Sequence, residues 1–135
     1  MDFYNHTRAL FAAGDVNEAN LKVMLVSGYT FAATETALTA ITSAQVSGNG
    51  WTVGGEAIAN SAVTAVGADA KLDGDDISVT ASGGDIGPAT ALVLVDATSS
   101  KPLFHYLFPS SQTAGDGTPF NVTWNAAGIA TWAAV

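Results

Sequence analysis

The 135-residue chain has no cysteine and very few basic residues. The lack of cysteine excludes disulfides, thiol catalysis and metal sites built on thiolates. Only 4 Lys and Arg stand against 12 Asp and Glu, so the formal net charge is -8. Phosphate binding needs clustered positive charge, as does attraction to an anionic membrane. The basic residues are scattered singly, which predicts neither a nucleic-acid partner nor a membrane partner: Arg8, Lys22, Lys71 and Lys101.

Long apolar runs are missing as well. The longest, residues 91–95, has the length of a strand and falls far short of the roughly 18 or more residues of a membrane-spanning helix. The first residues contain no basic region followed by an apolar stretch, so we expect no signal peptide. Synthesis in the cytoplasm is the expectation that follows.

The composition is that of a folded domain rather than a disordered tail. Hydrophobic residues make up 48% of the chain and charged residues 12%, against a usual charged share of about 25%. A disordered chain needs low hydrophobicity, which this sequence does not have. The length and the even composition predict a single domain over residues 1–135.

Short strand patterns separated by Gly and Asp dominate the chain from residue 51 onward. Residues 77–81 and 120–124 alternate apolar and polar side chains, as strands with one solvated face do. Residues 21–26 and 90–95 are mostly apolar, so we expect both faces of these strands to be covered. About seven strands predict an all-β fold, a single antiparallel β-sandwich or barrel of jelly-roll-like form.

Two connections and one longer strand-like region complete this prediction. Residues 120–124 and 129–132 flank a tight-turn sequence at 125–128, which predicts a hairpin. Residues 110–118 are rich in Gly, Ser and Asp and predict a loop. The region from 56 to 66 reads as strand.

Residues 2–13 predict a short N-terminal helix, with Asp2 as its N-cap and Gly14 as its stop. Its apolar side chains are expected to cover one open end of the fold or to dock on a neighbouring subunit: Phe3, Tyr4, Leu10 and Phe11. Residues 34–45 are compatible with a second short helix capped by Thr36, although the low helix propensity of their several Thr residues opposes it.

An acidic cluster is the first candidate site, formed by Asp69, Asp73, Asp75 and Asp76. Calcium takes six to eight oxygen ligands, and closely spaced acids beside a Gly can supply several. The spacing does not match an EF-hand loop, however. A solvated hairpin turn is the alternative interpretation, since Asp and Gly favour turns for backbone reasons.

The other polar candidates give no catalytic constellation. His6 and His105, without cysteine, fall short of the three or four ligands of a zinc site. Asp85 and Asp96 could be proposed as a glycosidase pair, but both are placed where turns end strands. The glycine-rich stretches lack the Lys of a phosphate-binding loop. We therefore expect no enzymatic activity and no catalytic, cofactor-binding or metal-binding residues.

The tryptophans Trp51, Trp124 and Trp132 are large for so alanine-rich a chain. Core packing is the first interpretation, and an interface is the second. A third is a small carbohydrate-binding module, in which Trp51 and Tyr29, exposed on loops, would stack on sugar rings.

Seven segments spread along the chain form a recognisable series: DVN (15–17), LKVML (21–25), GNGWTVGG (48–55), KLDGDDI (71–77), GGDIGPA (83–89), TAGDG (113–117) and TWNAAGI (123–129). In that order they resemble a family of small virion proteins of tailed bacteriophages. The resemblance spans almost the whole chain and brings no catalytic residues with it. It implies an accessory structural protein of the phage particle, made in the host cytoplasm and carried on the outer surface of the virion.

Within that resemblance, a capsid decoration (cement) protein that stabilises the mature head is the leading expectation. Its partner would be the major capsid protein or other virion proteins, and it would form a homo-oligomer, with a trimer as the specific guess. A tail, neck or fibre component is the alternative. The helix over 2–13 is the expected capsid-facing arm, and its deletion is expected to abolish capsid binding while leaving the β fold.

Overall fold

β-strands make up 47% of the structure and helices 11%. The computed structural model describes residues 1–133. The helices are α1 (Thr7–Ala13) and α2 (Thr39–Ser43), with a 3-10 turn at Glu18–Asn20. The strands are β1 (Asp2–Phe3), β2 (Leu21–Val26), β3 (Gln45–Val46), β4 (Glu56–Ala57), β5 (Ala62–Val66), β6 (Asp69–Asp73), β7 (Ile77–Thr80), β8 (Ile86–Asp96), β9 (Lys101–Ala114), β10 (Pro119–Val122) and β11 (Ala130–Ala133).

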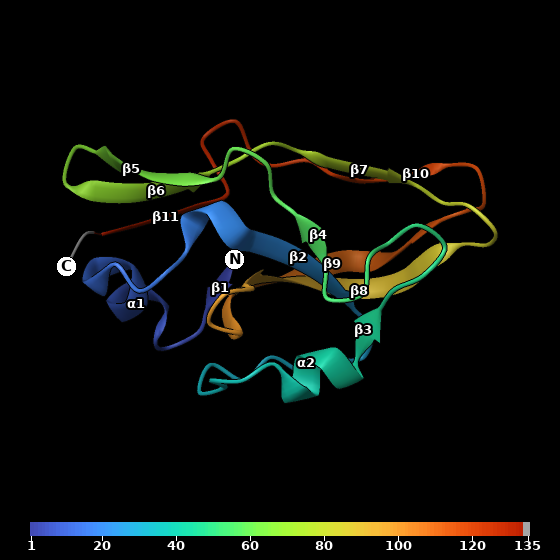
Figure 1. Ribbon diagram of the computed structural model, residues 1–135, viewed down its shortest axis with the longest axis horizontal. Coiled ribbons are helices and arrows are strands. Elements are labelled where there is room, and N and C mark those ends of the chain that lie inside the picture. Colours follow the sequence, from blue (N-terminus) through green and yellow to red (C-terminus); the bar gives the residue numbers. More distant parts are fainter. Residues whose placement is uncertain (134–135) are drawn as a thin grey trace.

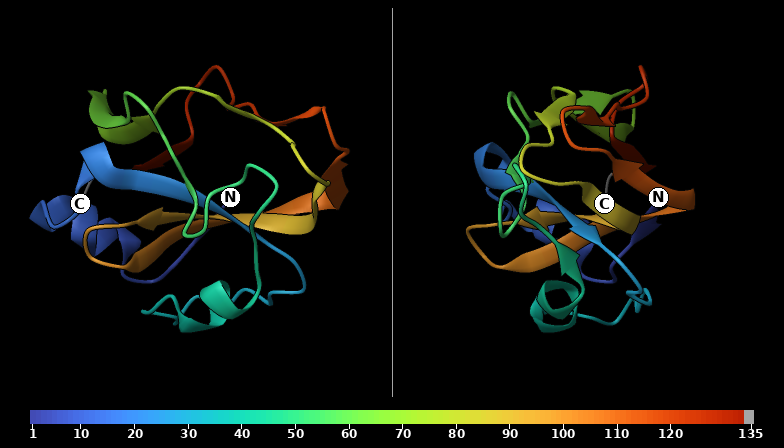
Figure 2. Two further views of the ribbon diagram at one scale, coloured as in Figure 1. Left: turned by 45° about the vertical axis from the view of Figure 1, so that its right-hand side comes forward. Right: turned by 90° about the vertical axis from the view of Figure 1, so that its right-hand side faces the viewer.

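The strands form antiparallel sheets of six, three and two strands. The six-stranded sheet has the order β1-β9-β8-β2-β3, with β4 also paired to β2. The smaller sheets are β11-β6-β5 and β10-β7. Figures 1 and 2 show the smaller sheets on one side of the large sheet and α2 on the other. The antiparallel β prediction is confirmed, whereas the barrel alternative is wrong, because no sheet within residues 1–133 closes into a barrel.

Two apolar cores lie on opposite faces of the large sheet. Leu21, Val23 and Leu25 of β2 belong to the core under the smaller sheets. Met24 and Val26 belong to the second core, which α2 covers with Ile41. Strand β8 divides its side chains between the two cores in the same way. Covering both faces explains why these strands are mostly apolar, as predicted.

The predicted hairpin between residues 120–124 and 129–132 is wrong. Strand β10 pairs with β7, and β11 pairs with β6. The tight turn is present, with Gly128 N donating to Asn125 O at 2.8 Å, but it interrupts one long ribbon that pairs residues 119–133 with 69–80. Alternating patterns suit either partner, and burial of the apolar face decides between them.

The N-terminal segment differs from the predicted helix over 2–13. Asp2 and Phe3 form β1, which pairs with His105 and Phe104 of β9. The helix begins at Thr7, and its N-cap is His6, which makes no side-chain capping bond. Asp2 is therefore not the cap, because its backbone is extended and engaged in the sheet. The stop at Gly14 is confirmed, with φ 74°.

The apolar side of this segment covers the body of the protein. The Phe3 ring lies 4.8 Å from the Phe104 ring, edge to face. The Phe11 ring lies 4.8 Å from the Trp132 ring. Such pairs add about 0.5–1.5 kcal/mol each beyond the burial of apolar area. Of the two roles expected for the stripe, the structure shows the first, a cover over one end of the fold.

Three smaller predictions also change. The expected loop at 110–118 is shorter, since β9 continues to Ala114. The region 56–66 divides into β4 and β5, which belong to different sheets. Helix α2 is present, but its N-cap is Leu38 rather than Thr36. Neither helix of residues 1–133 has the length and apolar character that a bilayer crossing needs.

Candidate functional site

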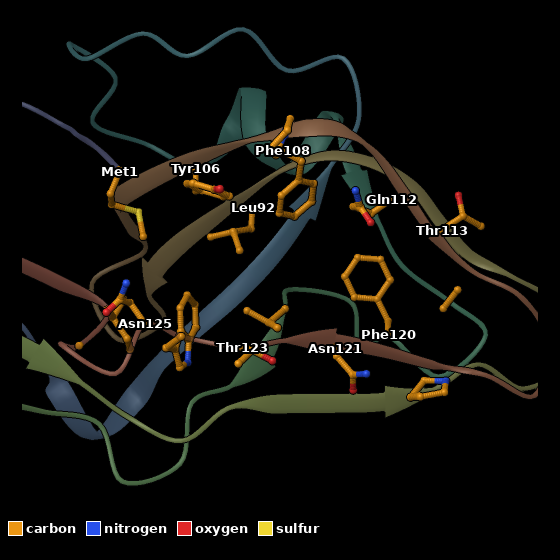
Figure 3. A pocket seen from close by; sticks show the side chains of 17 residues that line it. Met1, Leu92, Tyr106, Phe108, Gln112, Thr113, Phe120, Asn121, Thr123 and Asn125 are labelled. Carbon is orange, nitrogen blue, oxygen red and sulfur yellow. The ribbon is translucent and has the colours of Figure 1, made fainter.

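A groove opens between β9 and β10 (Figure 3). The two strands are consecutive and joined by a short turn at 115–118. They nevertheless belong to different sheets, because β10 pairs with β7 and β9 pairs with β8. The cavity left between them measures about 670 Å³, which is within the usual range of about 300–1,000 Å³ for ligand pockets.

The groove has an apolar floor and a mixed rim. Leu92, Phe120, Val122 and Ile129 are buried beneath it. Phe108 and Trp124 are half-buried in its walls, and Met1 and Tyr106 are exposed at its mouth. None of the 17 side chains around the groove carries a charge, although the chain as a whole carries -8.

The acidic segment between β6 and β7, residues 74–76, positions Trp124 in this groove. The backbone N–H of Trp124 donates to Asp76 Oδ1 at 2.8 Å. Its indole Nε1–H donates to the carbonyl oxygen of Asp75 at 3.0 Å. With both donors engaged, the ring is held in one orientation. These acids thus serve the turn that interrupts the long ribbon.

The acidic residues do not form a common metal site. Asp73 pairs with Lys71 Nζ at 3.0 Å, and the hydrogen bond from that ammonium lowers the pKa of the Asp73 carboxyl. Asp75 Oδ2 accepts a bond from Asn60 at 2.7 Å, and Asp69 lies exposed at the start of β6. Within residues 1–133, no group of His, Asp and Glu has the arrangement of a metal site. The hairpin-turn interpretation is wrong in detail, because the segment connects two sheets.

The two histidines lie apart in separate environments. His6 Nε2 lies 2.7 Å from the carbonyl oxygen of Pro102, which it bonds. His105 is 3% exposed and stacks on Phe31 at 4.9 Å. Its Nδ1 lies 3.1 Å from Asp2 Oδ2. Each histidine therefore links the N-terminal segment to β9.

Asp85 and Asp96 hold turns, as the sequence predicts. Asp96 is 1% exposed, and its carboxylate accepts bonds from the backbone N–H groups of Asn17 and Thr98. Asp85 Oδ1 accepts a bond from Asp116 N at 3.0 Å. The two carboxylates sit near opposite ends of β8, so the structure does not make them a glycosidase pair.

The expected sugar-stacking pair on loops is wrong for Trp51. This ring is 2% exposed and packs against Phe120 at 5.4 Å. The turn that bonds Gly48 to Trp51 directs it into the core. Tyr29 is half-buried, with its hydroxyl 2.9 Å from that of Tyr4. Burial, with a smaller contribution from this hydrogen bond, raises the pKa of Tyr4 well above its ordinary value.

Of the aromatic residues that the groove uses, sequence reasoning singled out Trp124 and missed Tyr106, Phe108 and Phe120. Tyr106 and Phe108 alternate with Leu107 along β9, so they face the same side as buried Phe104. That alternation was the available signal, but it does not reveal that β10 stays apart. Comparison of this chain with protein-family models, with curated proteins and with solved structures finds no match.

Proposed function

We propose that this protein is a capsid decoration protein of a tailed bacteriophage. In this proposal it is made in the host cytoplasm and binds the major capsid protein on the outer surface of the mature head. The sequence resemblance supports the class of protein, and one structural observation supports binding to a partner. That observation is an exposed apolar patch at the end of the large sheet.

This edge patch consists of Met1, Tyr106 and Leu107, which are 41%, 39% and 62% exposed. Pairing of Asp2 with His105 places Met1 beside Tyr106 on one face of β9. Leu107 follows Tyr106 at the same sheet edge and projects from the other face. Grouped apolar side chains on a surface are typical of protein contact sites. The patch also adjoins the N-terminal segment, the expected capsid-facing region.

The edge patch is suited to side-chain packing rather than to addition of a partner strand. Tyr4 N donates to Leu103 O across the β1–β9 edge. Backbone N–H groups point to alternate sides along a strand, so the N–H of Leu107 also points outward at this edge. Pro109 follows and has no N–H, and the β8–β9 register shifts between Ala89 and Ala91. Proline and bulges at an edge strand oppose edge-to-edge pairing.

The mechanism is stabilisation by mass action. A protein that binds the mature shell but not its precursor stabilises the mature state by an amount set by its concentration and affinity. The net charge of -8 keeps unbound copies apart. Assembly as a homotrimer on the shell, and a jelly-roll-like sandwich formed by the large sheet and the smaller sheets, are part of the same proposal.

Leu107→Glu is expected to weaken binding to purified mature capsids at least tenfold. A charge placed in an apolar contact is desolvated without a partner, which costs more than the 1.4 kcal/mol that a tenfold change represents. Binding is measured by cosedimentation of labelled protein with capsids that lack it.

Val66→Glu is the matched control, because Val66 is a similarly exposed aliphatic residue, at 54%, on the distant β5. It should bind like the unmodified protein. Equal binding by both variants would show that the edge patch is not the contact surface.

A further inference from the structure

We infer that the groove between β9 and β10 is a binding site for a neutral oligosaccharide. This goes beyond the proposed function and does not depend on it. Met1 and Tyr106 belong both to the edge patch and to the mouth of the groove. Leu107 projects from β9 on the face opposite Tyr106 and Phe108, so Leu107→Glu tests the capsid contact without changing the groove.

The walls of the groove supply aromatic faces. Phe108 hangs from β9 toward Phe120, which rises from β10 (Figure 3). Trp124 also lines the groove, and both of its N–H donors are already bonded to the acidic segment. The face of an aromatic ring carries partial negative charge and attracts the polarised C–H groups of a pyranose. Because the Trp124 ring is already oriented, a ligand need not order it.

The polar side chains are oriented in the same way. Gln112 Nε2 donates to the carbonyl oxygen of Ser110 at 2.9 Å, and its Oε1 is an acceptor that a ligand hydroxyl can use. Asn125 Oδ1 accepts from Ala127 N at 2.9 Å, which leaves the Nδ2 amino group to donate. Tyr106 adds a hydroxyl that can do either. The groove thus offers an acceptor, a donor and a hydroxyl around aromatic walls, which matches the hydroxyl groups and the apolar ring faces of a sugar.

Other ligand classes fit this lining less well. Ions and charged metabolites find no charged side chain among the residues around the groove. A lipid chain would leave the amides and the phenol at the rim without hydrogen bonds, which is costly once they are buried. An added peptide strand meets Pro109 on β9 and Pro119 on β10, and neither has an N–H to offer.

Trp124 provides its own reporter. The other tryptophans, Trp51 and Trp132, are 2% and 6% exposed, whereas Trp124 is half-buried at the groove. Cellohexaose, maltohexaose and chitohexaose, all neutral, are titrated into the full chain while tryptophan fluorescence is recorded. At least one of them is expected to shift the emission to shorter wavelength and to release heat in calorimetry.

Substitutions of groove residues show whether a sugar that binds the protein does so in the groove. In calorimetry, Trp124→Ala and Gln112→Ala are each expected to weaken binding at least fivefold. Gln112 is exposed, so its replacement tests the site even if Trp124→Ala destabilises the fold. Asn5→Ala, a change at an exposed residue outside the groove, should leave affinity unchanged.

Three outcomes would overturn the inference. They are no response to any of the three sugars at millimolar concentration, sugar binding that Gln112→Ala and Trp124→Ala leave unchanged, and preferential binding of an uncharged peptide or of a fatty acid at this groove.

Discussion

Deletion of residues 2–13 is expected to abolish cooperative folding rather than to leave an intact β domain. The segment contributes Tyr4 and Thr7, which are 1% and 0% exposed. It also contributes the rings of Phe3 and Phe11, which pack on Phe104 and Trp132. Loss of a single buried aromatic side chain costs about 3–5 kcal/mol, and a whole domain is stable by only about 5–15 kcal/mol.

The measurement is thermal unfolding followed by near-ultraviolet circular dichroism, with the full chain beside the truncated one. The control is the double variant Ala9→Glu with Ala12→Glu, which changes exposed positions of α1 and should unfold like the unmodified protein. A sharp transition in the truncated chain would contradict the packing described above. It would instead support the expectation that residues 2–13 form a dispensable arm.

Gly55→Ala is expected to destabilise the fold far more than Gly54→Ala, although the two residues are neighbours. Both have positive φ, 87° at Gly54 and 103° at Gly55, so each alanine pays roughly 1–2 kcal/mol for its backbone conformation. A methyl group at Gly54 meets nothing within 4 Å. At Gly55 it would lie 2.6 Å from the carbonyl oxygen of Val23, in the interior strand β2.

The clash cannot be relieved by a side-chain rotation, because the obstacle is backbone paired within the large sheet. We expect Gly55→Ala to cost at least about 2 kcal/mol more than Gly54→Ala, a magnitude typical of overpacked sites. Urea unfolding of the two variants measures the difference. Equal midpoints for both would show that the loop over β2 is not held at this distance.

The sequence predicts where individual strands lie better than it predicts which strands pair. The apolar runs at 21–26 and 90–95 and the alternation at 77–81 identified strands, because burial dictates side-chain type at each position. The hairpin around residues 125–128 failed, since β10 and β11 found better apolar partners in β7 and β6. The helix at residues 2–13 failed at its start, where pairing with β9 outweighs helix propensity.

The groove was beyond the reach of sequence reasoning for a related reason. It exists because β9 and β10, which are adjacent in sequence, pair with different strands and separate. The residues that orient Trp124 are Asp75 and Asp76, which are far away in the chain. The sequence suggests a calcium site at these acids, whereas in the structure they hold the turn between β10 and β11 and the ring of Trp124.

Whether the protein decorates a phage head is best measured by its copy number in purified virions of the phage proposed to encode it. Quantitative mass spectrometry against the major capsid protein gives that number. The proposed function predicts about one copy for each capsid subunit, since decoration follows the lattice of the shell. A few copies per particle would instead indicate the tail, neck or fibre, and complete absence from the virion would contradict the proposed function.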